Sequence, residues 1–380
     1  MSQTDTNPIL QFGTSRFLQA HADLFVSEAL AEGRALGPIT IVQTTGSAQG
    51  AGRVAAFRQS GGYPVRIRGF QDGVVIDEER RATAVTQAWQ TGSDWQAVRR
   101  HAASHARIIL SNTGDTGYQL SEGDHAGMLD GDVVPASFPA KLLVLLYGRF
   151  LAGAAPITLY PCELVVDNGS VLRELVVSLA RDWQLPFDAI AYLESGCIWV
   201  NSLVDRIVSE AIEPIGAVAE PYGLWAIEAQ PGMLLPCTHP QVVVTDSLQQ
   251  YEQRKLFLLN LGHTYLAQLW QDRGSPAGMT VREAMADGAM LAALESLWQD
   301  EVLPVFAAMG EAEAQASVAY LAQVRERFAN PFLAHRLADI AQNHAQKIAR
   351  RMAPVVALAH QLCPGLAQPR LHALLKGGAQ

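Results

Sequence analysis

The sequence lacks an excess of positive charge, a long hydrophobic run and a secretory leader. Its 28 lysine and arginine residues are outnumbered by 37 acidic residues, so the formal net charge is -9, which argues against a nucleic-acid-binding surface. No apolar run approaches the roughly 20 residues that cross a bilayer. The opening residues, MSQTDTNPIL, contain no basic segment followed by an apolar one. We therefore expect a globular cytoplasmic protein that binds neither nucleic acid nor membrane.

Cysteine is also scarce. The four cysteines stand at positions 162, 197, 237 and 363 and form no C-x-x-C pair, so the sequence contains neither a zinc ribbon nor a dithiol redox motif. Scattered cysteines are typical of buried thiols in a reducing compartment. The 380 residues, of which 49% are hydrophobic, are enough for two domains with a large core.

The first half of the chain alternates apolar, β-branched runs with helical patterns. Strands are predicted at residues 8–13, 38–46, 106–114 and 156–164, a hairpin at 63–79, and helices at 17–33, 95–105 and 139–153. This alternation predicts an α/β fold with a mostly parallel sheet covered on both faces. From about residue 201 the patterns are long and helical, including residues 202–212. We therefore predict an α/β domain over residues 1–215 and a mostly α-helical domain over residues 216–380.

The segment ILQFGTSRFLQAH, residues 9–21, has the arrangement of a dinucleotide-binding turn. An early strand ends in Gly13 and a helix follows, whose first N–H groups would bind a pyrophosphate. The G-x-G-x-x-G motif is absent, because Ser15 and Arg16 stand where glycines are expected. An ordinary strand-to-helix turn is the alternative interpretation.

The second predicted strand does not end in an acidic residue. Gln43 and Thr44 stand where an Asp or Glu would bind the ribose hydroxyls, so NAD and NADP both stay open. Arg53 or Arg58 would be available for a 2′-phosphate, with ordinary surface arginines as the alternative.

A second unusual segment is EQRKLFLLNLGH, residues 252–263, which carries polar side chains within an apolar run. On an ideal helix of about 100° per residue, Glu252, Lys255, Asn260 and His263 fall within one sector of roughly 140°. A desolvated lysine exchanges protons near neutral pH, and Asn and His donate hydrogen bonds to an oxygen that gains charge. Such a set would interconvert an alcohol and a ketone without a metal. The alternative is a satisfied core cluster whose lysine reaches the surface.

At these residues the sequence resembles the polyol-specific long-chain dehydrogenases and reductases, which include mannitol dehydrogenase, fructuronate reductase and tagaturonate reductase. The family signature K-x-x-x-x-N-x-x-H stands here as Lys255, Asn260 and His263. Five more blocks follow the family's order, namely ILQFGTSRFLQAH, ILSNTGDTGY, FPAKLLVLLYGRF, PCELVVDNG and VNSLVDRIV. The segments IVQTTG, YEQRKLFLLNLGHT and RFANPFLAHRLADIAQNHAQKIARR are most similar to tagaturonate reductase, also called altronate oxidoreductase.

The resemblance implies a Rossmann-like N-terminal domain, a helical C-terminal domain and metal-independent hydride transfer. It implies that Lys255 is the general acid/base and that Asn260 and Asn168 polarise the substrate oxygen. His263 would orient substrate and lysine, and Glu252 would relay protons.

The resemblance also implies which residues bind the cofactor and the substrate. The cofactor, NAD or alternatively NADP, would be bound by Gly13, Ser15, Arg16, Phe17, Gln43, Asn112 and Thr113. Asp205 and Arg206 of the VDRI block would lie near the substrate. One departure from the family is Gln19, which replaces the arginine of F-x-R-A-H.

The substrate class depends on a cation for a carboxylate. The candidates for that cation are Arg327, Lys347 and Arg336, each with an ordinary surface charge as the alternative. His344 is a weaker candidate, and Lys141 matches a family block without an assigned role. We predict a keto sugar acid such as tagaturonate as the substrate. The alternatives are a polyol or polyol phosphate, or a non-catalytic nucleotide-binding sensor. A monomer or a small homo-oligomer is expected.

Overall fold

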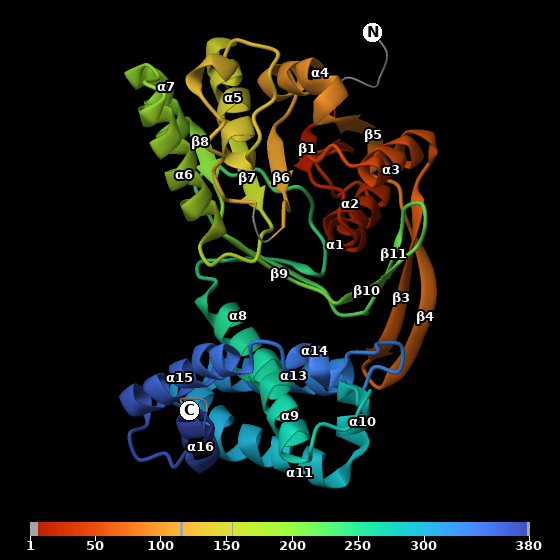
Figure 1. The fold of residues 1–380 in the computed structure, drawn as a ribbon, viewed down its shortest axis with the longest axis vertical. Helices are drawn as coiled ribbons and strands as arrows, with labels where there is room; N and C mark the ends of the chain where they lie inside the picture. The colour runs from red at the N-terminus through yellow and green to blue at the C-terminus, as the bar shows by residue number, and fades with distance from the viewer. Residues whose placement is uncertain (1–6, 115–116, 154, 378–380) are drawn as a thin grey trace. The chain divides into compact units, whose positions relative to one another are not determined.

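The computed structural model describes residues 7–114, 117–153 and 155–377 (Figure 1). The first six residues, part of the segment in which no leader is predicted, lie outside the described residues. The chain folds into two compact units. The first contains the described residues through Ile67 with Glu78–Ala219 and Gly223–Leu248, and the second contains Arg68–Asp77, Glu220–Tyr222 and the described residues from Gln249 onward. The main division between the two units therefore comes after Leu248, whereas the sequence predicts it after residue 215.

A six-stranded parallel sheet forms the centre of the first unit. Its strands are β1 (Ile9–Phe12), β2 (Ile39–Gln43), β5 (Val85–Gln90), β6 (Ile108–Ser111), β7 (Ile157–Pro161) and β8 (Cys197–Trp199). They lie in the order β5-β2-β1-β6-β7-β8, and every adjacent pair is parallel. Counted within this sheet, that is the order 3-2-1-4-5-6 of the doubly wound dinucleotide-binding fold. The predicted α/β class is confirmed.

Helices cover both faces of this sheet. They are α1 (Arg16–Ala20), α2 (Ala22–Ala31), α3 (Ala48–Gln59), α4 (Thr91–Ser104), α5 (Phe138–Leu151), α6 (Asn168–Asp182) and α7 (Phe187–Ala191). A 3₁₀-helix at Ala126–Met128 and a π-helix at Tyr192–Gly196 are also present. Every residue of β1, β2, β6 and β7 is buried. Because successive strand residues point to opposite faces, complete burial requires cover on both sides, which explains why these strands read as continuous apolar runs.

The helix predicted over residues 17–33 is divided at His21. The backbone there has φ −120° and ψ −97°, which ends α1 and begins α2. The buried imidazole of His21 lies at 2.9 Å from the Leu224 carbonyl through Nε2 and contacts the rings of Phe17 and Phe25. Burial lowers the pKa of His21 to about 3, so the ring is neutral. A tertiary contact thus overrides the helical periodicity.

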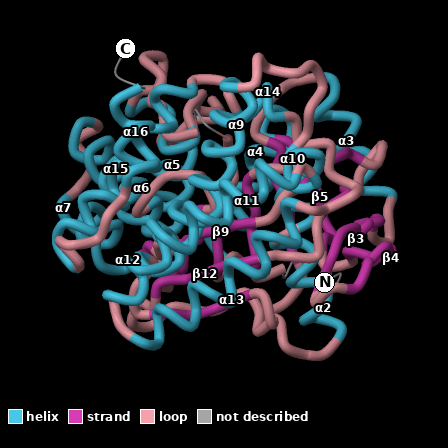
Figure 2. The backbone as a smooth tube through the Cα atoms, turned by 90° about the horizontal axis from the view of Figure 1, so that it is seen from below, coloured by secondary structure: helices cyan, strands magenta, loops and turns pink. Residues whose placement is uncertain are grey.

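Two smaller sheets complete the strands. One contains β10 (Val208–Ala211), β11 (Ala217–Ala219), β3 (Tyr63–Gln71) and β4 (Val74–Ala82), and the other contains β9 (Ser202–Asp205), β12 (Leu224–Glu228) and β13 (Val242–Thr245). The predicted hairpin at 63–79 is confirmed, and β3 and β4 lie side by side (Figure 2). Its turn residues Asp72 and Gly73 both have positive φ, 53° and 76°, as a tight hairpin turn requires.

The helix predicted at residues 202–212 is wrong, because this stretch forms β9 and β10. A run of that length with several β-branched residues fits either structure locally. Cross-strand packing decides: Val204 lies opposite the fully buried Trp225 of β12. Pairing with a strand about twenty residues later is a signal that local periodicity does not contain.

The second unit is mainly helical. Its helices are α8 (Gln249–Arg254), a π-helix at Lys255–Asn260, α9 (Leu261–Asp272), α10 (Val281–Ala286), α11 (Gly288–Leu297), a π-helix at Trp298–Val302, α12 (Leu303–Ala308), α13 (Glu311–Phe328), α14 (Leu337–Ile340), α15 (His344–Leu362) and α16 (Pro369–Gly377). None of the described helices is both long and apolar enough to cross a membrane.

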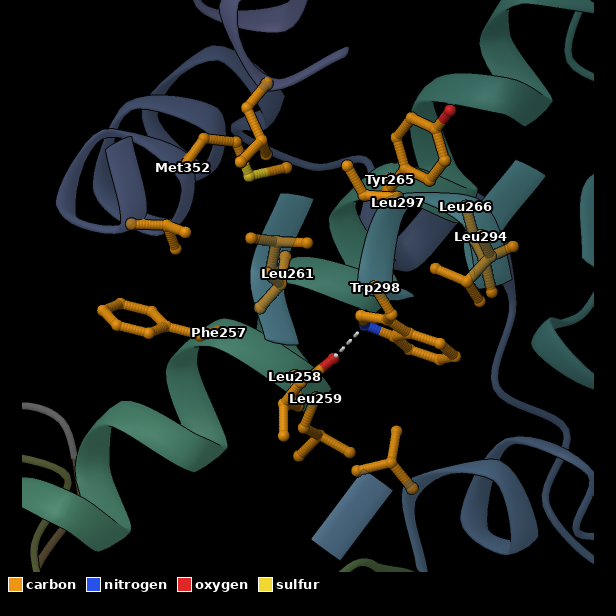
Figure 3. Packing of buried hydrophobic residues seen from close by; sticks show 14 of the residues in the cluster. Phe257, Leu258, Leu259, Leu261, Tyr265, Leu266, Leu294, Leu297, Trp298 and Met352 are labelled. Carbon is orange, nitrogen blue, oxygen red and sulfur yellow. Dashed lines mark hydrogen bonds between the residues drawn. The ribbon is translucent and has the colours of Figure 1, made fainter. Parts of the chain in front are cut away.

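Trp298 lies at the centre of the core of the second unit (Figure 3). Its indole N–H donates to the Leu258 carbonyl at 3.2 Å, and its ring packs against Phe328. Gly262 allows this close approach, because a Cβ there would lie 2.6 Å from Cζ2 of Trp298. The core therefore fixes the position of the helical segment that carries Lys255, Asn260 and His263.

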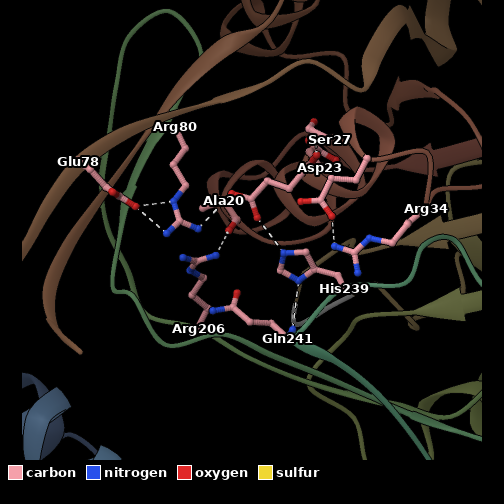
Figure 4. A network of polar contacts seen from close by, with 11 residues as sticks. Ala20, Asp23, Ser27, Arg34, Glu78, Arg80, Arg206, His239 and Gln241 are labelled. Atoms are coloured by element: carbon pink, nitrogen blue, oxygen red, sulfur yellow. Dashed lines mark hydrogen bonds and ion pairs between the residues drawn. The ribbon is translucent and has the colours of Figure 1, made fainter. Parts of the chain in front are cut away.

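A network of polar side chains joins α2, β4 and the segment before β13 in the first unit (Figure 4). Glu28 lies at 2.8 Å from Nε2 of His239 and at 3.0 Å from Nη1 of Arg80, which also pairs with Glu78. Burial alone would raise the pKa of Glu28, but the His239 hydrogen bond and the Arg80 charge lower it overall. The carboxylate is therefore kept ionised where it links the three segments.

Asp23, also on α2, is a buried carboxyl with uncharged partners. Its Oδ2 accepts from the Tyr63 hydroxyl at 2.7 Å, while Oδ1 and the Oε1 of Gln11 are buried without a hydrogen-bond partner among the described residues. Burial raises the pKa of Asp23 from 3.8 to about 7, against the lowering effect of hydrogen bonds with Tyr63 and Gln11. A proton on Oδ1 would give this cluster the donor that it lacks.

Asp23 should therefore make the protein less stable as the pH rises. A raised folded-state pKa contributes stability that is fully present below pH 3.8 and is lost as the pH rises through about 7. The difference between these two values corresponds to roughly 4 kcal/mol. Asp23→Asn removes the titration, so its thermal midpoint should fall less between pH 5 and pH 8 than that of the wild type. The exposed Asp130→Asn is the control, and equal pH dependence in the wild type and Asp23→Asn would contradict this assignment.

Candidate functional site

The turn after β1 fits the approach of a dinucleotide. Gly13 has φ 115°, and a Cβ there would lie 2.5 Å from the backbone oxygen of Asn112, which follows β6. The N–H of Gly13 donates to Val42 at 3.0 Å. The turn therefore lies between β1 and β6, where the strand order reverses and where ligands of open α/β sheets bind. A single glycine meets the steric need even though the full glycine motif is absent.

The predicted cofactor residues Ser15 and Asn112 lie together at this turn. The Ser15 hydroxyl caps α1 by accepting from the Leu18 N–H at 3.2 Å, and it donates to Oδ1 of Asn112 at 3.3 Å. Arg16 is exposed at the first residue of α1, and Phe17 stacks on His21 at 4.8 Å. The Ser15 side chain thus caps the N-terminus of α1 at a turn that lacks the glycine-rich motif.

Gln43 ends β2 as a neutral residue bound to its neighbours. Its Oε1 accepts from the Thr14 hydroxyl, and its Nε2 donates to Thr45 at 2.6 Å. No carboxylate stands at this position to bind ribose hydroxyls or to repel a 2′-phosphate. Of the two arginines considered for that phosphate, Arg58 pairs with Asp94 at 2.8 Å, whereas Nε of Arg53 is buried without a partner among the described residues. The choice between NAD and NADP is not decided by these groups.

The residues after β6 are held by a buried glutamate that the sequence did not single out. Oε1 of Glu163 accepts from the N–H and the hydroxyl of Thr113 at 3.0 and 2.9 Å, and Oε2 accepts from Ser111 at 3.0 Å. Burial raises the pKa of Glu163, although these hydrogen bonds act in the opposite direction. Glu163 stands in the PCEL block of the sequence. Its hydrogen bonds to Thr113 become apparent only in the folded structure.

Asn168 is committed to the backbone of the first unit. Its Nδ2 donates to the carbonyls of Ser202, Pro161 and Glu163 at 2.8, 3.1 and 3.1 Å, and its Oδ1 accepts from the Ser202 N–H at 3.0 Å. The side chain is buried at the start of α6. These bonds use both N–H groups of the amide, so this arrangement offers no support for Asn168 as a donor to a substrate oxygen. It joins α6 to β7 and β9.

Arg206 is similarly engaged within the first unit. It is buried, donates from Nη1 to the Ala20 carbonyl at 2.7 Å, and lies over the ring of Phe25 at 5.6 Å (Figure 4). Asp205, at the end of β9, is buried as well. The predicted substrate contact of Arg206 gains no support from these bonds, which connect β9 to the break between α1 and α2.

In the second unit, the segment with the predicted proton-transfer residues is not a regular α-helix. Lys255–Asn260 form a π-helix between α8 and α9. A π turn closes on residue i+5 instead of i+4, so residues five apart are nearer in direction than they are in an α-helix. Lys255 and Asn260 are five apart, and an α-helix would separate them by about 140°. The widened turn brings the two groups closer in direction than the ideal-helix placement.

His263 lies one turn further on, among aromatic rings. It stacks on Phe328 with 4.2 Å between ring centroids, and its ring lies edge-on to His335 at 4.8 Å. Nδ1 of His335 is buried without a hydrogen-bond partner among the described residues. Burial lowers the pKa of His335, with Asp339 raising it and Lys347 lowering it further. Phe328 and His335 stand in the segment RFANPFLAHR, and the sequence analysis did not single out either one.

The two predicted carboxylate-binding cations differ in their surroundings. Arg327 is buried and donates from Nε and Nη2 to the carboxylate of Glu220 at 3.0 and 2.8 Å, so its charge is already neutralised by a bidentate pair. Lys347 donates to the Ile340 carbonyl at 2.7 Å and forms no ion pair within the described part of the chain. An ammonium has three donors, so Lys347 keeps hydrogen-bonding capacity for an anion.

The remaining candidates are less distinctive. His344 shares a hydrogen bond with Gln268 at 3.0 Å, Arg336 is exposed at the start of α14, and Lys141 is buried and donates to the Ala136 carbonyl at 2.6 Å. Glu252 is half-buried on α8, one turn before Lys255. No group of three or more His, Cys, Asp or Glu side chains among residues 7–114, 117–153 and 155–377 is arranged to bind a metal ion.

Comparisons with known proteins cover nearly the whole chain. A family model described as the mannitol dehydrogenase Rossmann domain matches residues 7–233, and one described as the mannitol dehydrogenase C-terminal domain matches residues 247–375. Altronate oxidoreductase of Halalkalibacterium halodurans is 31% identical over 91% of this chain and 69% of its own length. Altronate oxidoreductase of Klebsiella pneumoniae strain 342 is 32% identical over 96% of this chain and 77% of its own length.

Two solved structures have a similar fold. D-sorbitol dehydrogenase in substrate-free form superposes with a TM-score of 0.80 and 21% identity over 94% of this chain and 76% of the other chain. Mannitol 2-dehydrogenase of Pseudomonas fluorescens, in complex with NAD and D-mannitol, gives a TM-score of 0.75 and 20% identity over 100% of this chain and 80% of the other chain.

Proposed function

The chain belongs to the mannitol dehydrogenase family, and from that premise we propose that it is an NAD(P)-dependent oxidoreductase that interconverts a keto sugar acid, such as tagaturonate, and its aldonate. The observation that carries the proposal is the pair of Lys255 and Asn260 within one π-helix, with His263 one turn away. The altronate oxidoreductase relatives, about 31% identical over most of the chain, support the sugar-acid substrate class.

The side chains supply the proton chemistry of such a reaction. When bound, NAD(P)H would supply the hydride that reduces the carbonyl carbon of the substrate. Lys255 donates a proton to the carbonyl oxygen as that oxygen gains charge, and the Asn260 amide donates a hydrogen bond to the same oxygen. His263 orients the substrate and the lysine from its place against Phe328. Half-buried Glu252, one helical turn before Lys255, returns a proton to the lysine.

The cofactor and the carboxylate are assigned to separate groups. Gly13, Ser15, Asn112 and Thr113 are proposed to bind NAD, since they gather at the carboxyl ends of β1 and β6. NADP stays open because Gln43 is neutral. Lys347 is proposed to bind the substrate carboxylate.

The proposed setting of the protein follows from its composition. All four cysteines are free thiols, which suits the reducing cytoplasm as the proposed location. A monomer or small homo-oligomer acting on a small molecule remains the proposed assembly.

The test of function is a comparison of substrates and cofactors. Oxidation of NADH and of NADPH is followed by absorbance, each with tagaturonate, fructuronate and fructose. Tagaturonate with NADH should give the highest kcat/KM, about tenfold or more above fructose, because fructose has no carboxylate to form a charge-assisted hydrogen bond with half-buried Lys347. Preference for fructose would replace the sugar acid with a polyol. Absence of turnover with all three in folded protein that binds NADH would contradict the proposed reaction.

Lys347 gives a separate test of the carboxylate site. Lys347→Ala should raise the KM for tagaturonate roughly tenfold or more, because a hydrogen bond to a charged group contributes about 1.5–3 kcal/mol. The KM for NADH should stay unchanged. Arg350→Ala, which removes an exposed cation from the same helix α15, is the control and should keep the wild-type KM. If Lys347→Ala also has the wild-type KM for tagaturonate, Lys347 does not bind the carboxylate.

A further inference from the structure

The π-helix at Lys255–Asn260 needs support from outside its own backbone. Within it, the N–H of Leu261 reaches back to the carbonyl of Leu256, five residues earlier. A π turn is rare and appears mostly as a single widened turn inside an α-helix, frequently at functional sites. Because relaxing to an α-helix would rotate Asn260 away from Lys255, whatever stabilises the wide turn also sets the geometry of that pair.

One such support is at the C-terminal end of the π-helix. The Asn260 carbonyl accepts from the Thr264 hydroxyl at 3.0 Å and from Nη1 of Arg351 at 3.1 Å. The same Nη1 donates to the Thr264 hydroxyl oxygen at 2.8 Å. The three groups form a closed triangle that joins α15 to the residue next to the proton-transfer pair. Thr264 is fully buried, whereas Asn260 and Arg351 are half-buried.

The charge of Arg351 makes this contact unusual. Arg351 forms no ion pair among the residues that the structure describes, and the partners of its Nη1 are a carbonyl and a hydroxyl. Burial lowers the pKa of Arg351, with a further contribution from Arg350. Partly burying a guanidinium without a carboxylate is costly. A cation kept at such a cost beside the Asn260 carbonyl suggests a role beyond packing.

We infer that Arg351 and Thr264 are positioning residues that hold the π turn open and thereby set the direction of the Asn260 amide relative to Lys255. The inference rests on the proposed function for its kinetic consequences, but the structural part stands without it. Neither residue touches the reacting atoms through the contacts described above. The alternative is that the triangle only attaches α15 to α9, in which case its loss would affect stability and not catalysis.

The experiment uses two matched pairs of variants in the full-length protein. Arg351→Ala removes the bridging guanidinium, and Arg350→Ala removes the neighbouring exposed charge as its control. Thr264→Val removes the hydroxyl with little change of shape, and Thr264→Ser, which keeps the hydroxyl, is its control. For each variant, kcat and KM are measured with tagaturonate and NADH across a range of pH. NADH affinity and the thermal midpoint are measured alongside.

Arg351→Ala and Thr264→Val should lower kcat about tenfold to a hundredfold, because small misplacements of reacting groups have effects of that size. The KM for tagaturonate and the affinity for NADH should stay within about threefold of the wild type, and the pH profile of kcat/KM should shift. Arg350→Ala and Thr264→Ser should behave like the wild type. Wild-type kcat and pH profile in both folded test variants would overturn the inference. A change in KM alone would place Arg351 in substrate binding instead.

Hydrogen exchange separates this inference from the proposed function. Amide exchange of residues 255–264 is compared in the wild type and in Thr264→Val, which keeps the protein's charge and fold even if Arg351→Ala unfolds. Faster exchange confined to this segment is expected, whether or not tagaturonate is a substrate. Unchanged exchange there would overturn the inference. A wild type that is inactive with faster exchange in the variant would contradict only the proposed function.

Discussion

The widened turn at Lys255–Asn260 decides the relative direction of two side chains that we propose to take part in proton transfer. A regular helix would direct the lysine and the amide to different sides, whereas the π-helix brings them nearer in direction. The turn is held by groups from three helices or turns around it. The Trp298 indole binds the Leu258 carbonyl, and Arg351 and Thr264 bind the Asn260 carbonyl. The same contacts therefore stabilise the core of this unit and set the geometry of the proposed proton-transfer residues.

The first unit uses its buried polar groups in a different way. Asn168 and Glu163 bind backbone groups and hydroxyls at the ends of β6 and β7. Glu163 anchors Thr113 after β6, and these bonds leave both side chains little capacity for a ligand. A family motif therefore marks residues that the site needs without saying whether they touch the substrate. The hydrogen bonds make that distinction, because the two amide hydrogens of Asn168 are already shared among three backbone carbonyls.

The sequence predicted the elements whose burial is uniform. Strands such as β1 and β6 are covered on both faces, so their apolar runs are unmistakable. It failed at β9 and β10, where pairing with β12 and with β11 decides, and at His21, where a carbonyl of β12 breaks the helix. Arg327 was predicted as a substrate cation because its partner Glu220 stands 107 positions earlier in the chain. The local sequence does not reveal a partner at that separation. The helical periodicity of residues 252–263 predicts an α-helix and contains no signal for the π turn.

Lys255→Ala tests whether Lys255 transfers the proton. NADH affinity is measured by fluorescence titration and turnover by the rate of NADH oxidation with tagaturonate in the same preparation. We expect kcat to fall by about two to four powers of ten, as for loss of a general acid, while NADH affinity stays within about threefold. A folded Lys255→Ala protein that turns over at the wild-type rate would contradict lysine catalysis.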